Sequence, residues 1–322
     1  MKMETILLLG GFGFIASNLL DHIDKYKLDL FNVIIFDKYD HHPEGLRFKC
    51  VNKTYNGNFS DNSIIETIFQ ENKIDIVLHA LNTTVPTTSN NICFDIESNV
   101  FPTINLLDLM VKYEAGKIIY ISSGGAIYGN SNSSKKHKEE DISYPISSYG
   151  IVKLTIEKYL YQYSYLYGLE ALIFRLSNPY GKYHYSDKQG IINIAARSAL
   201  FSLPFSVWGD GNTEKDYIYI NDFCEILFKL VDVKKKYLLL NVGSGQILSI
   251  NQLLQKIKES IPSFTWNYID QVKTDVQRFE LDLTELLSII GPYKFTDFSV
   301  GMEKTFNWLK ESNENITCNN SL

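Results

Sequence analysis

The stretch TILLLGGFGFIASNLLDHI, residues 5–23, constrains the fold more than any other part of the chain. A short apolar run passes directly into a glycine-rich turn, and the turn opens a helix. Gly11, Gly13 and Ala16 satisfy the pattern G-x-G-x-x-A, and Gly10 begins an overlapping G-x-x-G-x-x-A. Glycines let a pyrophosphate approach the backbone of such a turn, and the helix N-terminus attracts the phosphates. We therefore predict a dinucleotide-binding strand–turn–helix unit.

Short apolar runs alternate with helix-length segments through the first half of the chain. The runs lie at residues 5–9, 32–36, 74–80, 117–122 and 169–176, and helical patterns lie near 61–72, 95–113 and 148–167. Strands of a parallel sheet are buried on both faces, so they appear as continuous apolar runs joined by crossover helices. The pattern predicts an α/β fold with a doubly wound, Rossmann-like parallel sheet, mainly within residues 1–178.

The pattern changes after Asn178-Pro179-Tyr180-Gly181. Helical patterns near 190–202, 221–233, 250–260 and 300–310 are now separated by turn signals. We expect residues 179–322 to form mainly a smaller C-terminal α/β lobe. A strand is expected at 237–242, where it could join the first sheet, and the polar tail from about residue 311 is expected to be frayed.

Residues 147–168, SSYGIVKLTIEKYLYQYSYLYG, allow two interpretations. Tyrosines at every second position from Tyr159 to Tyr167 are typical of a strand. The segment is, however, longer than the roughly 10 residues that strands usually reach. Its apolar residues also recur at spacings of three and four, and Gly168 stands where a helix C-cap would. We predict a helix, which puts Tyr149 and Lys153 on one face.

Tyr149 and Lys153 are candidates for a catalytic pair. A free phenol has a pKa near about 10, too high for a base at neutral pH, and a neighbouring ammonium favours the phenolate. Spacing alone would make the pair a common accident, but it accompanies a dinucleotide turn. Ser122, Ser123 and Gly124 follow the strand at 117–122, and ligands sit at the carboxyl ends of such strands. We expect the Ser123 hydroxyl to share a proton with Tyr149 and a substrate oxygen.

Asp37 indicates which dinucleotide is bound. It ends the second apolar run, about 20 residues after the glycines, where an acid would hold a ribose hydroxyl. A carboxylate would repel the 2′-phosphate of NADP, so Asp37 favours NAD, although Lys38 stands beside it.

Composition excludes several classes of protein. The chain has 322 residues, 45% of them hydrophobic, and a formal net charge of -6, which does not suggest a protein built to bind nucleic acid. No segment approaches the roughly 18 apolar residues of a membrane span. The four cysteines form no C-x-x-C pair and have no histidine at metal spacing, so we expect neither a metal site nor a disulfide framework. A reducing, cytoplasmic setting is expected.

Taken in order, these motifs resemble the extended short-chain dehydrogenase/reductase family, in its nucleotide-sugar epimerase, dehydratase and reductase branch (UDP-glucose 4-epimerase-like). The resemblance covers nearly the whole chain. The matching stretches are GGFGFIASNL, GN at 57–58, LHA at 78–80, Asn99, SSGGAIYG, Y-x-x-x-K, NPYG, WGDGNTEKDYIYINDF and DVQR at 275–278.

The resemblance implies a set of site residues and no metal. Cofactor contacts are implied for Gly10, Gly13, Phe14, Ile15, Asp37, Lys38, Asn58, Phe59, Ala80, Leu81, Asn99, Ser122, Tyr149 and Lys153. A nucleotide-diphosphate sugar would meet Ser123, Gly124, Tyr149, Asn178, Lys215 and Arg278, with Tyr149, Lys153 and Ser123 catalytic. The helical patterns at 95–113 and 148–167 resemble the pair that forms a homodimer contact in this family, which suits their tyrosines.

Departures from the family pattern narrow the function. Gly124 replaces the usual serine or threonine, which leaves Ser123 as the nearest hydroxyl, and Lys215 replaces a usual arginine. Gly125-Ala126 replace the Asp-Glu pair of dehydratases, which argues against dehydration. The expected function is an NAD-dependent 4-epimerase acting through a transient 4-keto hexose, with a UDP-hexose as first substrate. The alternatives are a 4-keto-sugar reductase, a nucleotide-sugar 4-dehydrogenase, or a non-catalytic nucleotide-sensing module.

Overall fold

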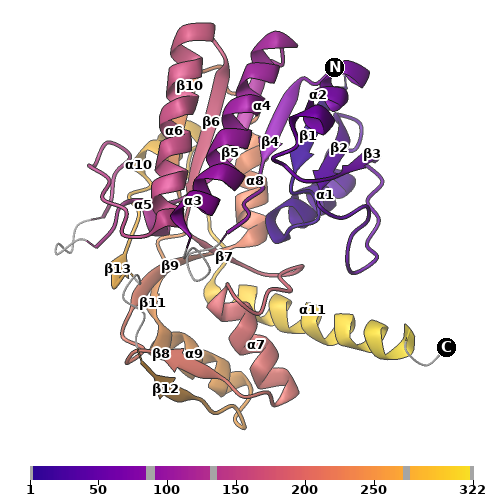
Figure 1. Ribbon diagram of the computed structural model, residues 1–322. Helices are drawn as coiled ribbons and strands as arrows, with labels where there is room; N and C mark the ends of the chain where they lie inside the picture. Colours follow the sequence, from indigo (N-terminus) through magenta and orange to yellow (C-terminus); the bar gives the residue numbers. More distant parts are fainter. Residues whose placement is uncertain (1–2, 85–90, 131–135, 271–275, 320–322) are drawn as a thin grey trace.

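A seven-stranded parallel sheet forms the centre of the computed structural model, in the order β10-β6-β5-β4-β1-β2-β3 (Figure 1). The structure describes residues 3–84, 91–130, 136–270 and 276–319, so Asp275 of the DVQR motif lies outside it. The strands are β1 (Glu4–Leu9), β2 (Phe31–Asp37), β3 (Val51–Asn56), β4 (Ile76–His79), β5 (Lys117–Ser123), β6 (Glu170–Leu176) and β10 (Tyr237–Val242). The predicted doubly wound parallel sheet is confirmed, and the strand expected at 237–242 extends it.

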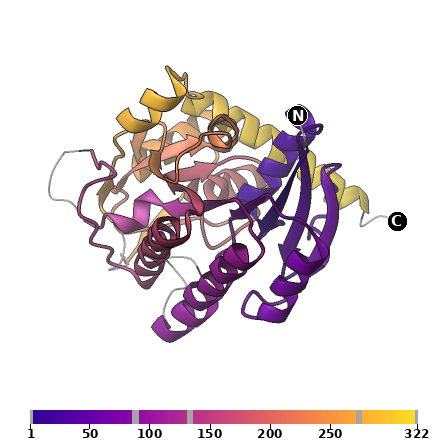
Figure 2. The ribbon, with the colours of Figure 1, turned by 90° about the horizontal axis from the view of Figure 1, so that it is seen from above.

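Helices cover both faces of this sheet (Figure 2). One face packs against α1 (Phe14–Tyr26), α8 (Ile220–Leu230) and α10 (Thr284–Ile290). The other packs against α2 (Asn62–Glu71), α4 (Phe101–Lys112) and α6 (Ser148–Tyr167). Along β1, Ile6 and Leu8 belong to the first core, while Leu7 and Leu9 belong to the second. Because successive side chains of a strand alternate between faces, a strand between two cores is apolar throughout.

The tyrosine-rich segment is a helix, as predicted. Ser147 caps α6 by accepting a hydrogen bond from the Gly150 amide at 3.2 Å, and Gly168 ends the helix with φ +73°. Val152, Ile156, Leu160 and Tyr163, spaced by three and four, are the buried apolar positions. Alternate tyrosines on a helix point in different directions, so most of the remaining ones face solvent.

The helical pattern at 95–113 is interrupted. α3 (Ile92–Asp95) continues into a π-turn, η1 (Ile96–Val100), and then into α4. A π-turn inserts one extra residue into a helix and rotates the side chains that follow. Asn99 lies in this turn and is buried.

The rest of the chain builds a second set of elements beneath the sheet (Figure 1). β9 (Glu214–Tyr219) pairs in parallel with β7 (Asn178–Tyr180) and β13 (Arg278–Phe279), and antiparallel with β11 (Ile247–Ser249). β8 (Ser206–Trp208) pairs with β12 (Asn267–Ile269), and the helices are α7 (Ile191–Phe201), α9 (Ile250–Ser260) and α11 (Phe298–Asn319).

Two features of this half bear on the expected division of the chain at residue 178 and on the expected polar tail. α8, α10 and β10 follow residue 178 but pack with the large sheet, so the division of the chain at that residue stays a prediction. α11 continues to Asn319, through the part of the tail that was expected to be frayed from residue 311. Among the described residues no helix is long and apolar enough to cross a membrane.

Candidate active site

A cleft of about 550 Å³ opens at the carboxyl ends of the strands, between the large sheet and the second set of elements. This is the edge of a doubly wound sheet where ligands bind. Its lining includes Gly10, Gly13, Phe14, Ile15, Ala80, Ser122, Ser123, Tyr149, Lys153, Asn178 and Lys215 among the residues predicted from sequence. The structure thus gathers in one cavity residues that lie up to two hundred positions apart in the chain.

The glycine turn between β1 and α1 approaches neighbouring backbone too closely for a side chain. Gly10 has φ +76°, and a Cβ there would lie 2.9 Å from the Cα of Leu81. The N-cap of α1 is Gly13, so no side chain caps the first amides of the helix. Phe14 and Ile15, in that first turn, line the cleft. Uncapped amides at a helix N-terminus facing a cavity fit the diphosphate of a dinucleotide.

Asp37 is buried at the end of β2 and holds the same turn. Its Oδ2 accepts a hydrogen bond from the Phe12 amide at 3.0 Å, and its Oδ1 accepts one from the Tyr39 amide at 3.3 Å. Each carboxylate oxygen has a second lone pair for a ribose hydroxyl. The Lys38 ammonium lies 4.8 Å from the centre of the Tyr39 ring.

Other predicted cofactor residues lie outside the described lining of the cleft and contact neighbouring loops or the core. Asn99 accepts a hydrogen bond from the Thr83 amide at 3.0 Å and so fixes the loop after β4. Phe59 is buried in the core, and exposed Asn58 accepts from the Ser60 amide at 3.0 Å. The side chains of Asp37, Lys38, Asn58, Phe59, Leu81 and Asn99 are not among the described cleft-lining residues, and their cofactor contacts remain predictions.

Tyr149 and Lys153 lie together one helical turn apart on α6. The Lys153 Nζ donates a hydrogen bond to the Ile121 carbonyl at 2.8 Å and lies 5.7 Å from the centre of the Tyr149 ring. It also lies 4.7 Å from the centre of the Tyr120 ring. The helix therefore presents phenol and amine to the end of β5, as the spacing predicted.

Burial changes the acid–base properties of both groups. It lowers the pKa of Lys153 to about 7, an effect that the Glu157 carboxylate opposes. Burial raises the pKa of Tyr149 to about 12, and a hydrogen bond with the Ser123 side chain acts in the opposite direction. In the ligand-free protein the phenol is therefore neutral at pH 7, and it needs added positive charge to become a base.

Gly124, where the family pattern has a hydroxyl residue, lies in a crowded part of the site. Gly124 starts the short helix α5 (Gly124–Ile127), and a Cβ there would lie 3.1 Å from both the Arg175 carbonyl and the Leu281 side chain. A serine at this position would have to displace its neighbours. The hydroxyl that contacts the phenol belongs to Ser123 instead.

Predicted substrate residues are brought together only in part. Asn178 and Lys215 line the cleft. The side-chain amide of Asn178 donates a hydrogen bond from Nδ2 to the Asp216 backbone carbonyl at 2.9 Å. Arg278 is not among the described lining residues, and its guanidinium pairs with Glu214 at 2.9 Å and Glu280 at 3.3 Å. A contact between Arg278 and a substrate diphosphate remains a prediction and would require these pairs to rearrange.

Several lining residues were missed by sequence reasoning. Phe12, His42, Thr84, Tyr183, His184, Tyr185 and Phe279 all face the cleft. The His184 ring stacks on Phe14, with ring centres 4.3 Å apart, and so joins the loop after β7 to the start of α1. His184 follows the NPYG motif by three residues, and this closeness to a predicted substrate motif is the only local indication that it belongs to the site. Nothing local in the sequence indicates that this loop meets α1.

Comparison with known proteins identifies the family. The model of the NAD dependent epimerase/dehydratase family matches residues 6–243. The chain belongs to this family. The "Putative UDP-glucose 4-epimerase" of Methanocaldococcus jannaschii is 31% identical over 315 residues, 96% of this chain and 99% of that protein. The dTDP-4-dehydro-6-deoxyglucose reductase of Escherichia coli is 27% identical over 294 residues, covering 90% of this chain and 92% of that protein.

A solved structure shows the same architecture. The UDP-glucose 4-epimerase of Thermotoga maritima, determined with UDP-glucose, has a TM-score of 0.88 and 27% identity, covering 96% of this chain and 99% of that one. Membership of the family makes the chain an enzyme with NAD as its cofactor, among epimerases, dehydratases and reductases of nucleotide sugars. The residues at the start of α1 fit such a cofactor, as described above.

Proposed function

We propose that this protein is a nucleotide-sugar 4-epimerase that acts on a UDP-hexose through a transient 4-keto sugar. The observation that carries the proposal is the contact of the Ser123 hydroxyl with the Tyr149 phenol in the cleft, beside the buried Lys153 amine. NAD, when bound, supplies the acceptor and later the donor of the C4 hydride.

Tyr149 exchanges the proton of the C4 hydroxyl in this proposal. The phenol gives its proton to bulk solvent through neighbouring groups, takes the hydroxyl proton as the ketone forms, and returns it when the ketone is reduced from the other face. Lys153 in its ammonium form favours the phenolate by its charge. Ser123 hydrogen bonds both the phenol and the sugar oxygen, which aligns the proton transfer.

The residues after Ser123 support an epimerase over a dehydratase. Loss of water from the sugar needs an acid and a base beside the reacting carbons. Gly125 and Ala126, in α5, line the cleft where the resemblance puts that pair, and neither carries an ionisable group. A reductase remains the second candidate, since the E. coli relative carries that name and the same catalytic groups would serve it.

One experiment separates these functions. The purified protein is incubated with UDP-glucose or UDP-galactose and no added cofactor, and the sugars are followed by proton NMR. An epimerase reaches the same mixture from either side and keeps NAD that mass spectrometry detects. A reductase forms no C4 epimer and consumes one NADH for each 4-keto sugar added. A panel of dTDP- and GDP-sugars is run in parallel, so that a wrong nucleotide is not read as an inactive enzyme.

We further propose that the enzyme is a homodimer. α3 and α4 pack beside α6 on one face of the molecule (Figures 1 and 2). Large apolar side chains remain exposed on these elements, namely Ile92, Phe94, Phe101, Ile151, Tyr161, Tyr165, Leu166 and Tyr167. Exposed apolar side chains gathered on neighbouring helices are typical of a subunit contact, and a second copy of the chain supplies the same helices.

A further inference from the structure

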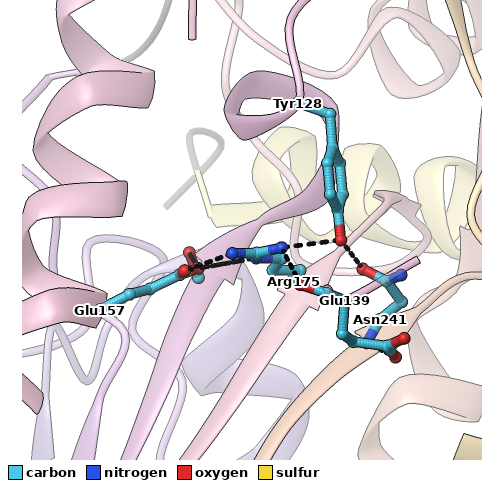
Figure 3. Close-up of polar contacts among 6 residues, drawn as sticks. Tyr128, Glu139, Glu157, Arg175 and Asn241 are labelled. Carbon is cyan, nitrogen blue, oxygen red and sulfur yellow. Dashed lines mark hydrogen bonds and ion pairs between the residues drawn. The ribbon is translucent and has the colours of Figure 1, made fainter. Parts of the chain in front are cut away.

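A buried ion pair joins α6 to β6 (Figure 3). Glu157 and Arg175 are 1% and 2% exposed. The Arg175 Nη2 donates to the Glu157 Oε2 at 2.8 Å, and its Nε donates to the Glu157 Oε1 at 3.2 Å. A bidentate pair of this kind fixes both the distance and the orientation of its partners.

Hydrogen bonds extend the pair at both ends. On one side the Ser122 hydroxyl donates to the Glu157 Oε1 at 2.6 Å. On the other, the Arg175 Nη1 donates to the Tyr128 hydroxyl at 2.8 Å, and that hydroxyl donates to the Asn241 Oδ1 at 2.7 Å (Figure 3). The Arg175 Nη1 also reaches the Glu139 carbonyl at 3.2 Å. The network thus joins β5, α6, β6 and β10.

The position of the network connects it to the cleft. Ser122 is the direct neighbour of Ser123, and it stands opposite Arg175 in the register of β5 with β6. Glu157 lies one helical turn after Lys153 and two turns after Tyr149 on α6. The hydrogen bond from Ser122 to Glu157 therefore links the strand that carries the serine to the helix that carries the other two groups.

We propose that Glu157 and Arg175 are positioning residues, which hold the end of β5 against α6 so that Ser123 meets Tyr149. Glu157 also lies one helical turn from Lys153, where its carboxylate favours the ammonium form of that side chain. This inference rests on the proposed catalytic role of these three groups. A buried ion pair is a weak source of stability, because burying both charges costs about as much as their attraction returns. Its retention directly behind the site is better explained by what it orients.

Of the titratable groups described around Lys153, Glu157 is the one that carries a negative charge at neutral pH. Burial lowers the pKa of His79 to about 3 and raises that of Tyr120, so neither carries charge at neutral pH. Among the groups described around Lys153, only the Glu157 carboxylate raises its pKa. The groups that face Lys153 are Tyr149 and Glu157 from α6, Tyr120 from β5 and His79 from β4, with Arg175 of β6 behind Glu157.

The Glu157→Gln variant tests the proposal. Because a shift of about 1 Å in a reacting group can lower turnover on the order of 10²-fold, we expect kcat to fall by about 10-fold to 100-fold with KM for the sugar little changed. Removing the carboxylate lowers the pKa of Lys153, so the alkaline decline of kcat should begin at a lower pH than in the wild type. Lysine-selective NMR titration, with the Lys153 signal assigned by Lys153→Met, measures the same pKa shift without any substrate.

Two further variants separate positioning from folding. Ser122→Ala cuts the link to β5 without removing a charge, and should lower kcat while leaving the Lys153 titration in place. Tyr163→Phe is the control, because it removes another hydrogen bond of α6, a partly buried one to Asp108 at 2.6 Å, away from the cleft. It should change neither quantity. If Glu157→Gln fails to fold, judged by circular dichroism, Ser122→Ala decides the positioning claim together with an NADH titration, because Ser122 also lines the cleft: a kcat loss with unchanged NADH binding supports positioning, and an unchanged kcat overturns it.

The outcomes are distinguishable from failure of the proposed function. Unchanged kcat in both Glu157→Gln and Ser122→Ala, in protein whose Tyr149→Phe variant is inactive, overturns the positioning role alone. An unchanged Lys153 titration in Glu157→Gln overturns the electrostatic role. Full activity in Tyr149→Phe overturns the proposed function, and with it the basis of this inference.

Discussion

At the scale of single residues, Tyr149 is the group on which the proposed reaction depends. Phenylalanine keeps the ring and its packing but cannot exchange a proton, so Tyr149→Phe should lower kcat on the order of 10²–10⁴-fold. Initial rates on a sugar that the wild type converts, with circular dichroism as the folding check, measure this. Near-full activity would contradict the catalytic role of the helix.

Ser123→Ala gives a second, graded result at the same place. Its hydroxyl contacts the phenol, while a Cβ at Gly124 next to it would lie 3.1 Å from the Arg175 carbonyl oxygen and the Leu281 side chain. We expect a kcat loss of about 10-fold or more, smaller than that of Tyr149→Phe, because the base itself remains. Ser164→Ala, which removes a hydrogen bond from α6 to the Lys236 carbonyl and does not line the cleft, is the matched control. Equal activities in the two serine variants would mean that Tyr149 contacts the sugar without Ser123.

Lys153 should lower the stability of the ligand-free fold. Its pKa falls to about 7 in the folded protein from 10.5, so the unfolded chain binds more protons between these pH values and stability rises with pH across that window. Lys153→Met removes this penalty. The variant should be inactive yet unfold at a higher temperature at pH 6, with the difference shrinking towards pH 10.

Thermal unfolding of nucleotide-free protein at several pH values measures this effect. Lys158→Met, an exposed lysine of the same helix, is the control and should show no pH-dependent difference. A Tm for Lys153→Met that is lower than the wild type at pH 6 would show that the hydrogen bond to the Ile121 carbonyl outweighs the cost of burying the charge.

At the scale of the elements, two glycines with positive φ should behave differently. Gly10 and Gly168 have φ +76° and +73°, so an alanine at either costs about 1–2 kcal/mol of backbone strain. Only at Gly10 would the added Cβ also press on Leu81, whereas nothing lies within 4 Å at Gly168. Gly10→Ala should weaken NAD binding at least 10-fold, and Gly168→Ala should leave it unchanged.

Fluorescence titration with NADH measures both variants. Titration with NADPH in the same series also tests Asp37, since the carboxylate should make NADPH bind more weakly. Equal losses in the two glycine variants would attribute the effect to general destabilisation.

The elements that sequence predicted best are those with a strong local pattern. α9 begins at Ile250 and ends at Ser260, as expected, and the buried strands have continuous apolar runs. β3 was missed because it is an edge strand with few buried residues, so VNKTYN has no apolar run. The π-turn was missed because its one-residue offset depends on packing around Asn99.

Site residues divide in the same way. Gly10, Tyr149 and Lys153 stand in motifs whose spacing alone places them on one turn or one helix face. Arg175 had a local signal, a charge inside the apolar strand LIFRL, but its partner Glu157 could be recognised only once the packing of α6 on the sheet was known. Contacts between the loop after β7 and α1 depend on how distant segments meet, which no local pattern encodes.

At the scale of the whole molecule, the cleft exists because two parts of the chain interleave. β10, α8 and α10 come from beyond residue 178 yet pack on the large sheet, so the strands β7, β9 and β13 are anchored on both sides of the cavity. The network around Arg175 connects β10 to β6, because Tyr128 hydrogen bonds both Asn241 and Arg175.

The apolar face of α3, α4 and α6 carries the last prediction, that of a dimer. Phe101 and Tyr165 are 56% and 78% exposed on this face, and burying them against a second copy removes apolar area from water. We expect a dimer at micromolar concentration by light scattering, and Phe101→Glu and Tyr165→Glu should shift it to monomer because a buried carboxylate has no partner there. Tyr26→Glu, at an exposed tyrosine of α1 on the opposite side of the sheet, should remain dimeric. A wild-type protein that light scattering shows to be a monomer at micromolar concentration would overturn the proposed dimer.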